Sequence, residues 1–387
     1  MSSAPVQSNQ RIQYLDVLRG FAITGVLFAY VFWNLGTEPS NTFTTFDNIL
    51  NQAGYFIIDS KCYTILASLF MVGFVMHMNR SKDQAGSLNI FRRRLIGLWV
   101  IGMLHALLLR NGDILAPYAI LSFIAILFYK SSNRTIIFAI VIVFLLQAEL
   151  PQLWRSLGLP FHQRPVNHGG NYWVQNFDWL KHWYAIAIFF WETTLLLLLV
   201  GLLIGKAFIQ NGKKLSYRQL IIIAISGFLA GGLSYLVETF YQSKIEALPD
   251  IGNTYILRAI VYYLVSFIHQ IGMASAYASI FFLLARNFKL SLLANLGRMS
   301  LTNYILQALI VVPFCLVFNL FDHLTPTIAL IMFAVIWTLQ VLFSRWWLKH
   351  FEFGPLEWVL RRFTYGKTLV SKKEKIQTEF VPAAVIF

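Results

Sequence analysis

The sequence predicts an all-α, polytopic integral membrane protein with about ten transmembrane helices. Of its 387 residues, 57% are hydrophobic and only 12% are charged, and the mean hydropathy is +0.62. A soluble domain carries about a quarter charged residues, so the depletion of charge indicates that most of the chain lies where ionised groups are costly. We therefore expect one transmembrane domain over residues 1–350 and a cytoplasmic tail over 351–387.

The individual spans follow from hydrophobic runs, because a helix needs roughly 20 mostly apolar residues to cross the hydrocarbon core. Two of the runs are short and only four residues apart, which predicts a tight helical hairpin between them. The expected spans lie near residues 16–34, 62–79, 95–110, 114–130, 134–150, 184–205, 218–240, 257–285, 300–320 and 325–348.

The distribution of Lys and Arg predicts the orientation of these spans. With the N-terminus inside, 24 of the 31 basic residues fall in cytoplasmic segments and seven fall outside. Both termini are then cytoplasmic (N-in/C-in), residues 80–94 and 206–218 are inside, and 35–60, 151–183 and 241–256 are outside. The cytoplasmic segments of a membrane protein therefore account for the net charge of +14, and no nucleic-acid partner is implied.

Residues 351–366 are too polar to span the membrane but have the pattern of a helix lying on its surface. Pro355 suits a first helical turn, and apolar residues such as Trp358 alternate with Arg361 and Arg362. This pattern is typical of an interfacial helix on an anionic cytoplasmic leaflet.

Polar residues at membrane depth need a partner or a water-filled cavity, so they are the candidates for function. At the start of the first span, Asp16 and Arg19 lie three residues apart on one helix face, and Gly20 permits close helix approach. The two charged residues form either a structural ion pair or part of a site for an anionic cytosolic ligand.

A second candidate group surrounds the short hairpin. His105 lies in the outer half of the third span, and Arg110, Asp113 and Tyr118 follow it. The reversal of the chain can bring His105 and Asp113 together, and a His with a carboxylate partner is a common general base near neutral pH.

Two further groups lie within later spans. His269 is near the middle of the eighth span, where an imidazole serves either a cavity or an interhelical hydrogen bond. Ser300 can cap the ninth span, and Asn303 and Gln307 continue its polar face. That polar face either packs helices together or contacts a substrate.

Other chemistries lack support in the sequence. Cys62 and Cys315 are expected to be buried thiols, and no Cys/His cluster predicts a metal site, so we expect no metal. There is no phosphate-binding loop of the kind that drives ATP-dependent transport.

The chain resembles the YeiB family of bacterial membrane proteins over nearly its whole length, and residues of about 225–370 resemble that family's C-terminal region, which carries a domain-of-unknown-function label. The blocks that carry the resemblance are Leu15–Gly20, the run Arg92–Arg94 leading to His105, Gly112–Leu115 with Tyr118, Gly297–Tyr304, Phe353–Trp358 and Thr364–Gly366.

The Asp-x-x-Arg-Gly start of the first span also resembles the transmembrane acyltransferases, which transfer acyl groups from cytosolic acyl-CoA to acceptors across the membrane. Relatives carry Asn where this chain has Tyr30. If that Asn binds substrate or stabilises an oxyanion, Tyr30 would supply a hydroxyl that projects several ångströms further.

The resemblance implies an acyltransferase of the cell (cytoplasmic) membrane that uses acyl-CoA as co-substrate and a small-molecule or glycan acceptor outside. His105 would be the base, Asp113 its support, and Tyr118 or Asn303 would polarise the carbonyl. The residues expected to bind CoA phosphates are Arg19, Arg92, Arg93, Arg94 and Arg298. The residues expected near substrate are Asp16, Tyr30, His269, Asn303 and Gln307.

Two alternatives stay open at this point. A small-solute transporter without covalent catalysis would also use ten spans, an intramembrane His and a polar ninth helix. A non-catalytic scaffold is a third reading. The lipid bilayer is a partner in each case, and a homo-oligomer is compatible with all three.

Overall fold

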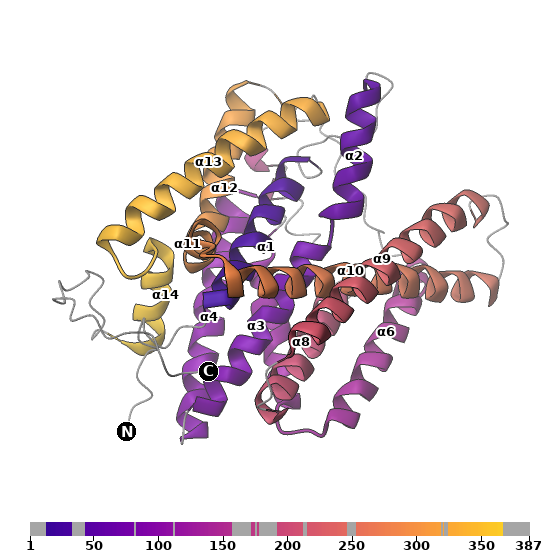
Figure 1. Ribbon diagram of the computed structural model, residues 1–387, viewed down its shortest axis with the longest axis horizontal. Helices are drawn as coiled ribbons and strands as arrows, with labels where there is room; N and C mark the ends of the chain where they lie inside the picture. The colour runs from indigo at the N-terminus through magenta and orange to yellow at the C-terminus, as the bar shows by residue number, and fades with distance from the viewer. Residues whose placement is uncertain are drawn as a thin grey trace.

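The computed structural model describes residues 13–32, 43–80, 83–110, 113–156, 172–174, 176–177, 192–211, 215–245, 253–318, 320 and 324–366 (Figure 1). The regular elements in these ranges are helices. They are α1 (Gln13–Phe32), α2 (Thr45–Ile57), α3 (Lys61–Arg80), α4 (Gln84–Leu108), α5 (Leu115–Ala125), the 3₁₀ helix η2 (Ile126–Phe128), α6 (Asn133–Ser156), α8 (Glu192–Asn211), α9 (Tyr217–Ile245), α10 (Asn253–Asn287), α11 (Ser291–Arg298), α12 (Ser300–Val317), α13 (Pro326–His350) and α14 (Pro355–Tyr365).

The helical character of the predicted spans is confirmed for most of their described residues, and residues 184–191 of the sixth predicted span lie outside the described ranges. Within the described ranges, six helical segments are long and apolar enough to cross a membrane, and three further apolar helices are shorter. These helices indicate a multi-pass membrane protein. The number of ten spans and their orientation stay predictions.

Two helices lie where the sequence analysis expected connecting segments. Helix α2 falls in the segment expected outside the membrane. It begins with a capping box in which Thr44 and Asp47 exchange hydrogen bonds. Asp47 also accepts hydrogen bonds from the backbone and hydroxyl of Thr327, which tie α2 to α13. Helix α11 is the second, and its eight residues are too short to register as an apolar run.

Helices α1 and α11 touch through paired glycines. A Cβ atom on Gly20 would lie 1.9 Å from the carbonyl oxygen of Leu293, and one on Gly297 would lie 1.8 Å from that of Asp16. Both distances are far below van der Waals contact, so only glycine fits at either position. The expected close approach at Gly20 is confirmed, and it positions the Asp16–Arg19 turn against α11.

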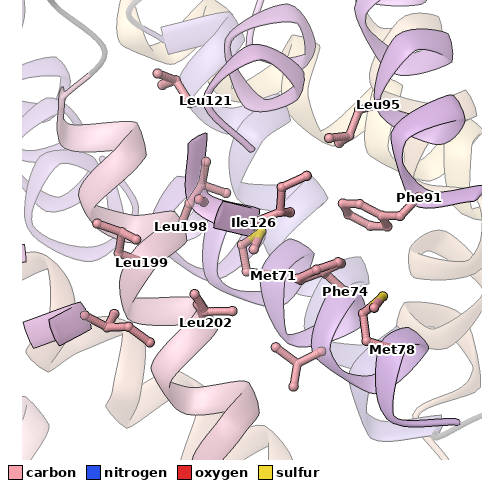
Figure 2. Packing of buried hydrophobic residues seen from close by; sticks show 13 residues of the cluster. Met71, Phe74, Met78, Phe91, Leu95, Leu121, Ile126, Leu198, Leu199 and Leu202 are labelled. Carbon is pink, nitrogen blue, oxygen red and sulfur yellow. The ribbon is translucent and has the colours of Figure 1, made fainter. Parts of the chain in front are cut away.

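The core beside the candidate site is apolar and closely packed (Figure 2). Met71, Phe74 and Met78 of α3 pack against Phe91 and Leu95 of α4 and against leucines of α8. This packing holds α3 and α4 side by side, so that polar residues elsewhere on these helices can line a cavity.

Helix α14 is packed onto the helical domain rather than standing apart as a tail. It lies beside α4 (Figure 1). There, Leu360 and Phe363 fill the space left by Gly97. The carboxylate of Glu357 accepts hydrogen bonds from the backbone N–H groups of Leu301 and Thr302 at 2.7 and 3.1 Å. The prediction that Ser300 caps α12 is therefore wrong, because Glu357 supplies the cap from another helix.

Candidate functional site

The hairpin between α4 and α5 brings His105 and Asp113 together. Nδ1 of His105 lies 3.1 Å from Oδ1 of Asp113, and the two side chains are 2% and 0% exposed. The ring nitrogen and the carboxylate make no regular hydrogen bond, although they lie within ion-pair distance. The separation is within the range in which a carboxylate supports a histidine base. A catalytic role for the pair stays a prediction.

Tyr304 of α12 joins this pair from a third helix. Its hydroxyl donates to Oδ1 of Asp113 at 3.2 Å and accepts from the backbone N–H of Ile114 at 3.1 Å. Its ring centre lies 5.0 Å from that of His105. The other carboxylate oxygen of Asp113 accepts from the N–H of Ala116 at 2.7 Å and so caps α5. Asp113 thus has a fixed orientation toward both rings.

Tyr118 and Tyr30 lie on different sides of this group. The Tyr118 hydroxyl donates to the carbonyl of Tyr63 at 3.3 Å. The Tyr30 ring lies 4.9 Å from the guanidinium of Arg110, and its buried hydroxyl has no regular hydrogen bond within the described residues. Tyr30, which stands where relatives carry Asn, therefore packs near the C-terminal end of α4.

A cavity of about 220 Å³ lies between α1, α3, α4, α11, α12 and α14, and we call it the basic cavity. Five arginines face two carboxylates in its lining, which leaves an excess of about three positive charges when the histidine is neutral. Its ionisable residues other than tyrosine are Asp16, Arg19, His77, Arg80, Arg94, Arg298, Glu357 and Arg361. Arg19 is paired with Asp16 at 3.0 Å but remains 30% exposed.

A second cavity of about 170 Å³ adjoins the first, and we call it the apolar cavity. The two cavities share wall residues, namely Arg19, Gly73, Arg94, Ser300, Glu357 and Leu360. Beyond the shared wall the lining becomes mostly apolar, with Leu66, Leu69, Phe70, Leu98 and Leu301. It also includes Tyr118 and Tyr304. The lining therefore changes from basic to apolar between the arginines and Tyr304, whose hydroxyl contacts Asp113.

The lining that the two cavities share includes Glu357, whose carboxyl group has a raised pKa. Burial raises the pKa of Glu357 above its ordinary value, and the hydrogen bonds from Thr302 oppose that shift. The helix α14 thereby contributes both a cap for α12 and an ionisable group to the cavities.

The structure divides the predicted phosphate-binding residues. Arg19, Arg94 and Arg298 line the basic cavity, whereas Arg92 and Arg93 are exposed on α4 and line neither cavity.

Among the cavity residues that the sequence did not indicate are His77, Arg80, Tyr304, Glu357 and Arg361. His77 and Arg80 are three residues apart at the end of α3, a spacing that could have placed them on one face. Tyr304 belongs to the quoted Gly297–Tyr304 block, whereas nothing local to Arg361 indicates that α14 folds back onto the cavity.

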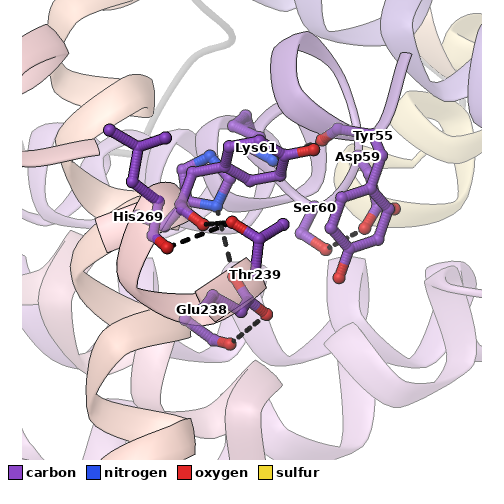
Figure 3. Close-up of polar contacts among 10 residues, drawn as sticks. Tyr55, Asp59, Ser60, Lys61, Glu238, Thr239 and His269 are labelled. Atoms are coloured by element: carbon purple, nitrogen blue, oxygen red, sulfur yellow. Dashed lines mark hydrogen bonds and ion pairs between the residues drawn. The ribbon is translucent and has the colours of Figure 1, made fainter. Parts of the chain in front are cut away.

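The remaining candidates lie away from both cavities. The Asn303 side chain donates to Leu296 and Ser344, and that of Gln307 donates to Ile23 and Gln340, so both hold helices together. His269 belongs to a separate polar cluster (Figure 3). Cys62 and Cys315 are buried free thiols, as predicted.

Comparisons with known proteins agree with the family resemblance. Residues 203–367 match the family described as "Protein of unknown function (DUF418)". The Uncharacterized protein YeiB of Escherichia coli is 28% identical, over 90% of this chain and 95% of that protein. These matches support a YeiB-like family.

Two Bacillus relatives extend the match over almost the whole chain. The Uncharacterized protein YxaH of Bacillus subtilis is 24% identical, over 97% of this chain and 100% of that protein. The Uncharacterized 39.9 kDa protein in amylase 3'region of Bacillus acidopullulyticus is 27% identical, over 96% and 99%. No solved structure matches the chain significantly. The matches therefore cover nearly the full length of this chain and of these relatives, whose names state no activity.

Proposed function

We propose that the protein is a membrane acyltransferase that moves an acyl group from cytosolic acyl-CoA to a small-molecule or glycan acceptor on the outer side of the cell membrane. The observation that carries the proposal is the junction of the basic and apolar cavities, which ends at Tyr304 and its partner Asp113. CoA has a cluster of phosphates at one end and a long, uncharged thiol arm at the other. The two cavities have the matching order of charge and polarity.

The phosphates would bind the arginines of the basic cavity. Charge-assisted contacts from guanidinium groups are the strongest that proteins make to phosphate. Arg19, Arg94 and Arg298 lie in parts of the chain that the topology prediction places on the cytoplasmic side, where acyl-CoA is found. The thiol arm would extend along Phe70, Leu98 and Leu301 into the apolar cavity.

The chemical step would take place around the tyrosines at the end of the apolar cavity. The hydroxyl of Tyr118, which makes only a long hydrogen bond of 3.3 Å to the carbonyl of Tyr63, would turn to donate to the thioester carbonyl. Nε2 of His105 has no hydrogen-bond partner in the described residues and would take the proton from the acceptor hydroxyl or amine. The acceptor then attacks the carbonyl carbon, the carbon–sulfur bond breaks, and the CoA thiolate leaves and is protonated.

Tyr304 lies between His105 and the apolar cavity, because it lines the cavity while its ring contacts His105. This position suits a reaction in which donor and acceptor arrive from opposite sides. The donor would occupy the cavities, and the acceptor would approach His105 from the end of the α4–α5 hairpin. The proposed topology, with ten spans and both termini inside, puts that end toward the outside.

The test uses protein reconstituted in liposomes with acyl-CoA, and free CoA thiol is measured in the presence and absence of extracts of cell-surface material. We expect thiol release that depends on the extract, with a loss of at least about 100-fold in His105→Ala. Acyl-CoA that stays intact with every extract, or equal release by His105→Ala, would contradict the proposal.

A proton-coupled transporter is the second candidate function. The observation that favours it is the cluster of buried ionisable groups around His269, because such groups at membrane depth commonly lie on ion or proton pathways. We prefer the acyltransferase, because neither the basic cavity nor the apolar cavity includes residues of this cluster.

A further inference from the structure

Four ionisable side chains, three of them buried and Asp59 half-buried, lie together at a place that neither cavity reaches. Asp59 and Lys61 flank the turn between α2 and α3, Glu238 is on α9 and His269 is on α10 (Figure 3). Lys61, His269 and Glu238 are 1%, 3% and 5% exposed. Charged groups are rarely this buried unless they are paired or functional.

Direct contacts join His269 to Glu238, and Asp59 and Lys61 lie near enough to interact with them through their charges. Nδ1 of His269 lies 3.7 Å from Oε2 of Glu238, and Ser266 donates to the other carboxylate oxygen at 2.9 Å. The ammonium of Lys61 donates to the carbonyl of Tyr55 at 2.7 Å. Nε2 of His269 has no hydrogen-bond partner among the described residues. The imidazole is therefore paired on one side only.

Aromatic rings and a strained turn enclose the cluster. The rings of Phe56 and Tyr235 lie 5.8 and 5.5 Å from the imidazole, centre to centre. Ser60, between Asp59 and Lys61, has φ of 61°, which makes it the one non-glycine residue with positive φ in the described ranges. A non-glycine residue keeps such a conformation only where its surroundings enforce it.

The charges of this cluster do not balance while the imidazole is neutral. Asp59 and Glu238 contribute two negative charges and Lys61 contributes one positive charge. The other titratable groups that face it from the described elements are Tyr55, Cys62, Tyr235 and Tyr262, which are neutral at physiological pH. One negative charge is therefore in excess in a cluster of which three side chains are buried and Asp59 is half-buried, where water screens an uncompensated charge poorly.

We propose that the cluster of Asp59, Lys61, Glu238 and His269 is a binding site for one proton, held between the imidazole and its carboxylate neighbours. With this proton bound, the four side chains sum to zero charge. Because the groups interact, the proton belongs to the cluster as a whole. A buried, exchangeable proton is the component that a proton-coupled process in the membrane requires, and it is independent of acyl-CoA binding.

The test follows the unfolding equilibrium in mixed detergent and SDS micelles as a function of pH. In the wild type, loss of the proton leaves the buried charge, so the unfolding constant should rise with pH by up to about tenfold per pH unit over one window. Glu238→Gln makes the cluster neutral without a proton and should lose this slope. His350→Gln removes an exposed histidine of α13 and should keep it.

A charge-restoring pair separates charge from damage to the fold. Lys61→Met with Glu238→Gln again leaves one negative charge and should regain the slope that Glu238→Gln alone loses. If Glu238→Gln keeps the wild-type slope, or the double variant stays flat, the proposal is wrong. A slope that disappears when sodium replaces choline in the buffer also overturns it, because the site would then take a metal cation.

An independent readout is the imidazole signal of His269 in ¹⁵N-histidine NMR of the protein in nanodiscs. The signal absent from His269→Gln should change over the same pH window as the unfolding constant. An unchanged signal throughout that window would overturn the proposal even if the Glu238→Gln variant fails to fold.

Discussion

Replacing Asp113 by Asn tests whether the His105–Asp113 pair acts as one unit. The variant keeps a carbonyl oxygen that can accept from the N–H of Ala116, so the cap of α5 survives, but it removes the negative charge 3.1 Å from the imidazole. At an effective dielectric constant of about 20, unit charges at this separation interact by about 5 kcal/mol, which is an upper bound for the lost support of the imidazolium.

That bound agrees with the rate contribution of a general base, roughly 10²–10⁴-fold. We therefore predict that Asp113→Asn lowers the turnover of acyl-CoA by a factor in this range while the thermal midpoint changes little. Asp83→Asn is the matched control, because Asp83 caps α4 in the same way and is exposed. It should leave turnover unchanged.

The double variant with His105→Ala decides the matter, because residues that act as a unit give non-additive losses. The combined loss should be little greater than the larger single loss. Turnover that is unaffected by Asp113→Asn, or losses that multiply in full, would refute the pairing as a catalytic unit.

Four further predictions concern the cavity, the packing and the topology. Arg19→Ala should weaken acyl-CoA binding more than tenfold in a binding titration, whereas Arg92→Ala, outside the cavity, should not. Gly297→Ala should destabilise the protein by about 1–3 kcal/mol or more in SDS titrations, since its Cβ would meet backbone. Burial raises the pKa of Glu357 in the folded protein. The stabilisation from its protonated form is full below the ordinary glutamate pKa and is lost as the pH rises through the raised pKa. In Glu357→Gln, this decrease should disappear from the pH profile of the thermal midpoint. Ala85→Cys, exposed at the start of α4, should react with an impermeant thiol reagent only after permeabilisation, and labelling in intact cells would reverse the topology.

The helices were predictable because each apolar run is long enough to identify itself, and burial in lipid leaves the backbone no alternative to a helix. Helices α2 and α11 were not, because one is amphipathic and the other has only eight residues. Their formation depends on tertiary contacts such as Asp47 with Thr327 and the glycine contact between α1 and α11.

The site was predictable where the chain itself brings residues together. His105 and Asp113 are joined by a short hairpin, so their contact followed from sequence distance alone. Tyr304 is 191 residues from Asp113, and Arg361 reaches the basic cavity only because α14 folds back against α4. Sequence spacing holds no information on such contacts. For the same reason, the sequence could not show that Arg94 lines the basic cavity while its neighbours Arg92 and Arg93 do not.

Equilibrium binding of acyl-CoA to the purified protein tests the central claim most directly. The basic cavity predicts saturable binding of acetyl-CoA that weakens as salt increases, and competition by free CoA but not by pantetheine, which lacks the phosphates. Binding should fall more than tenfold in Arg19→Ala and stay at the wild-type level in Arg92→Ala. A protein that is folded by its thermal midpoint and binds no acetyl-CoA at low salt would contradict the account.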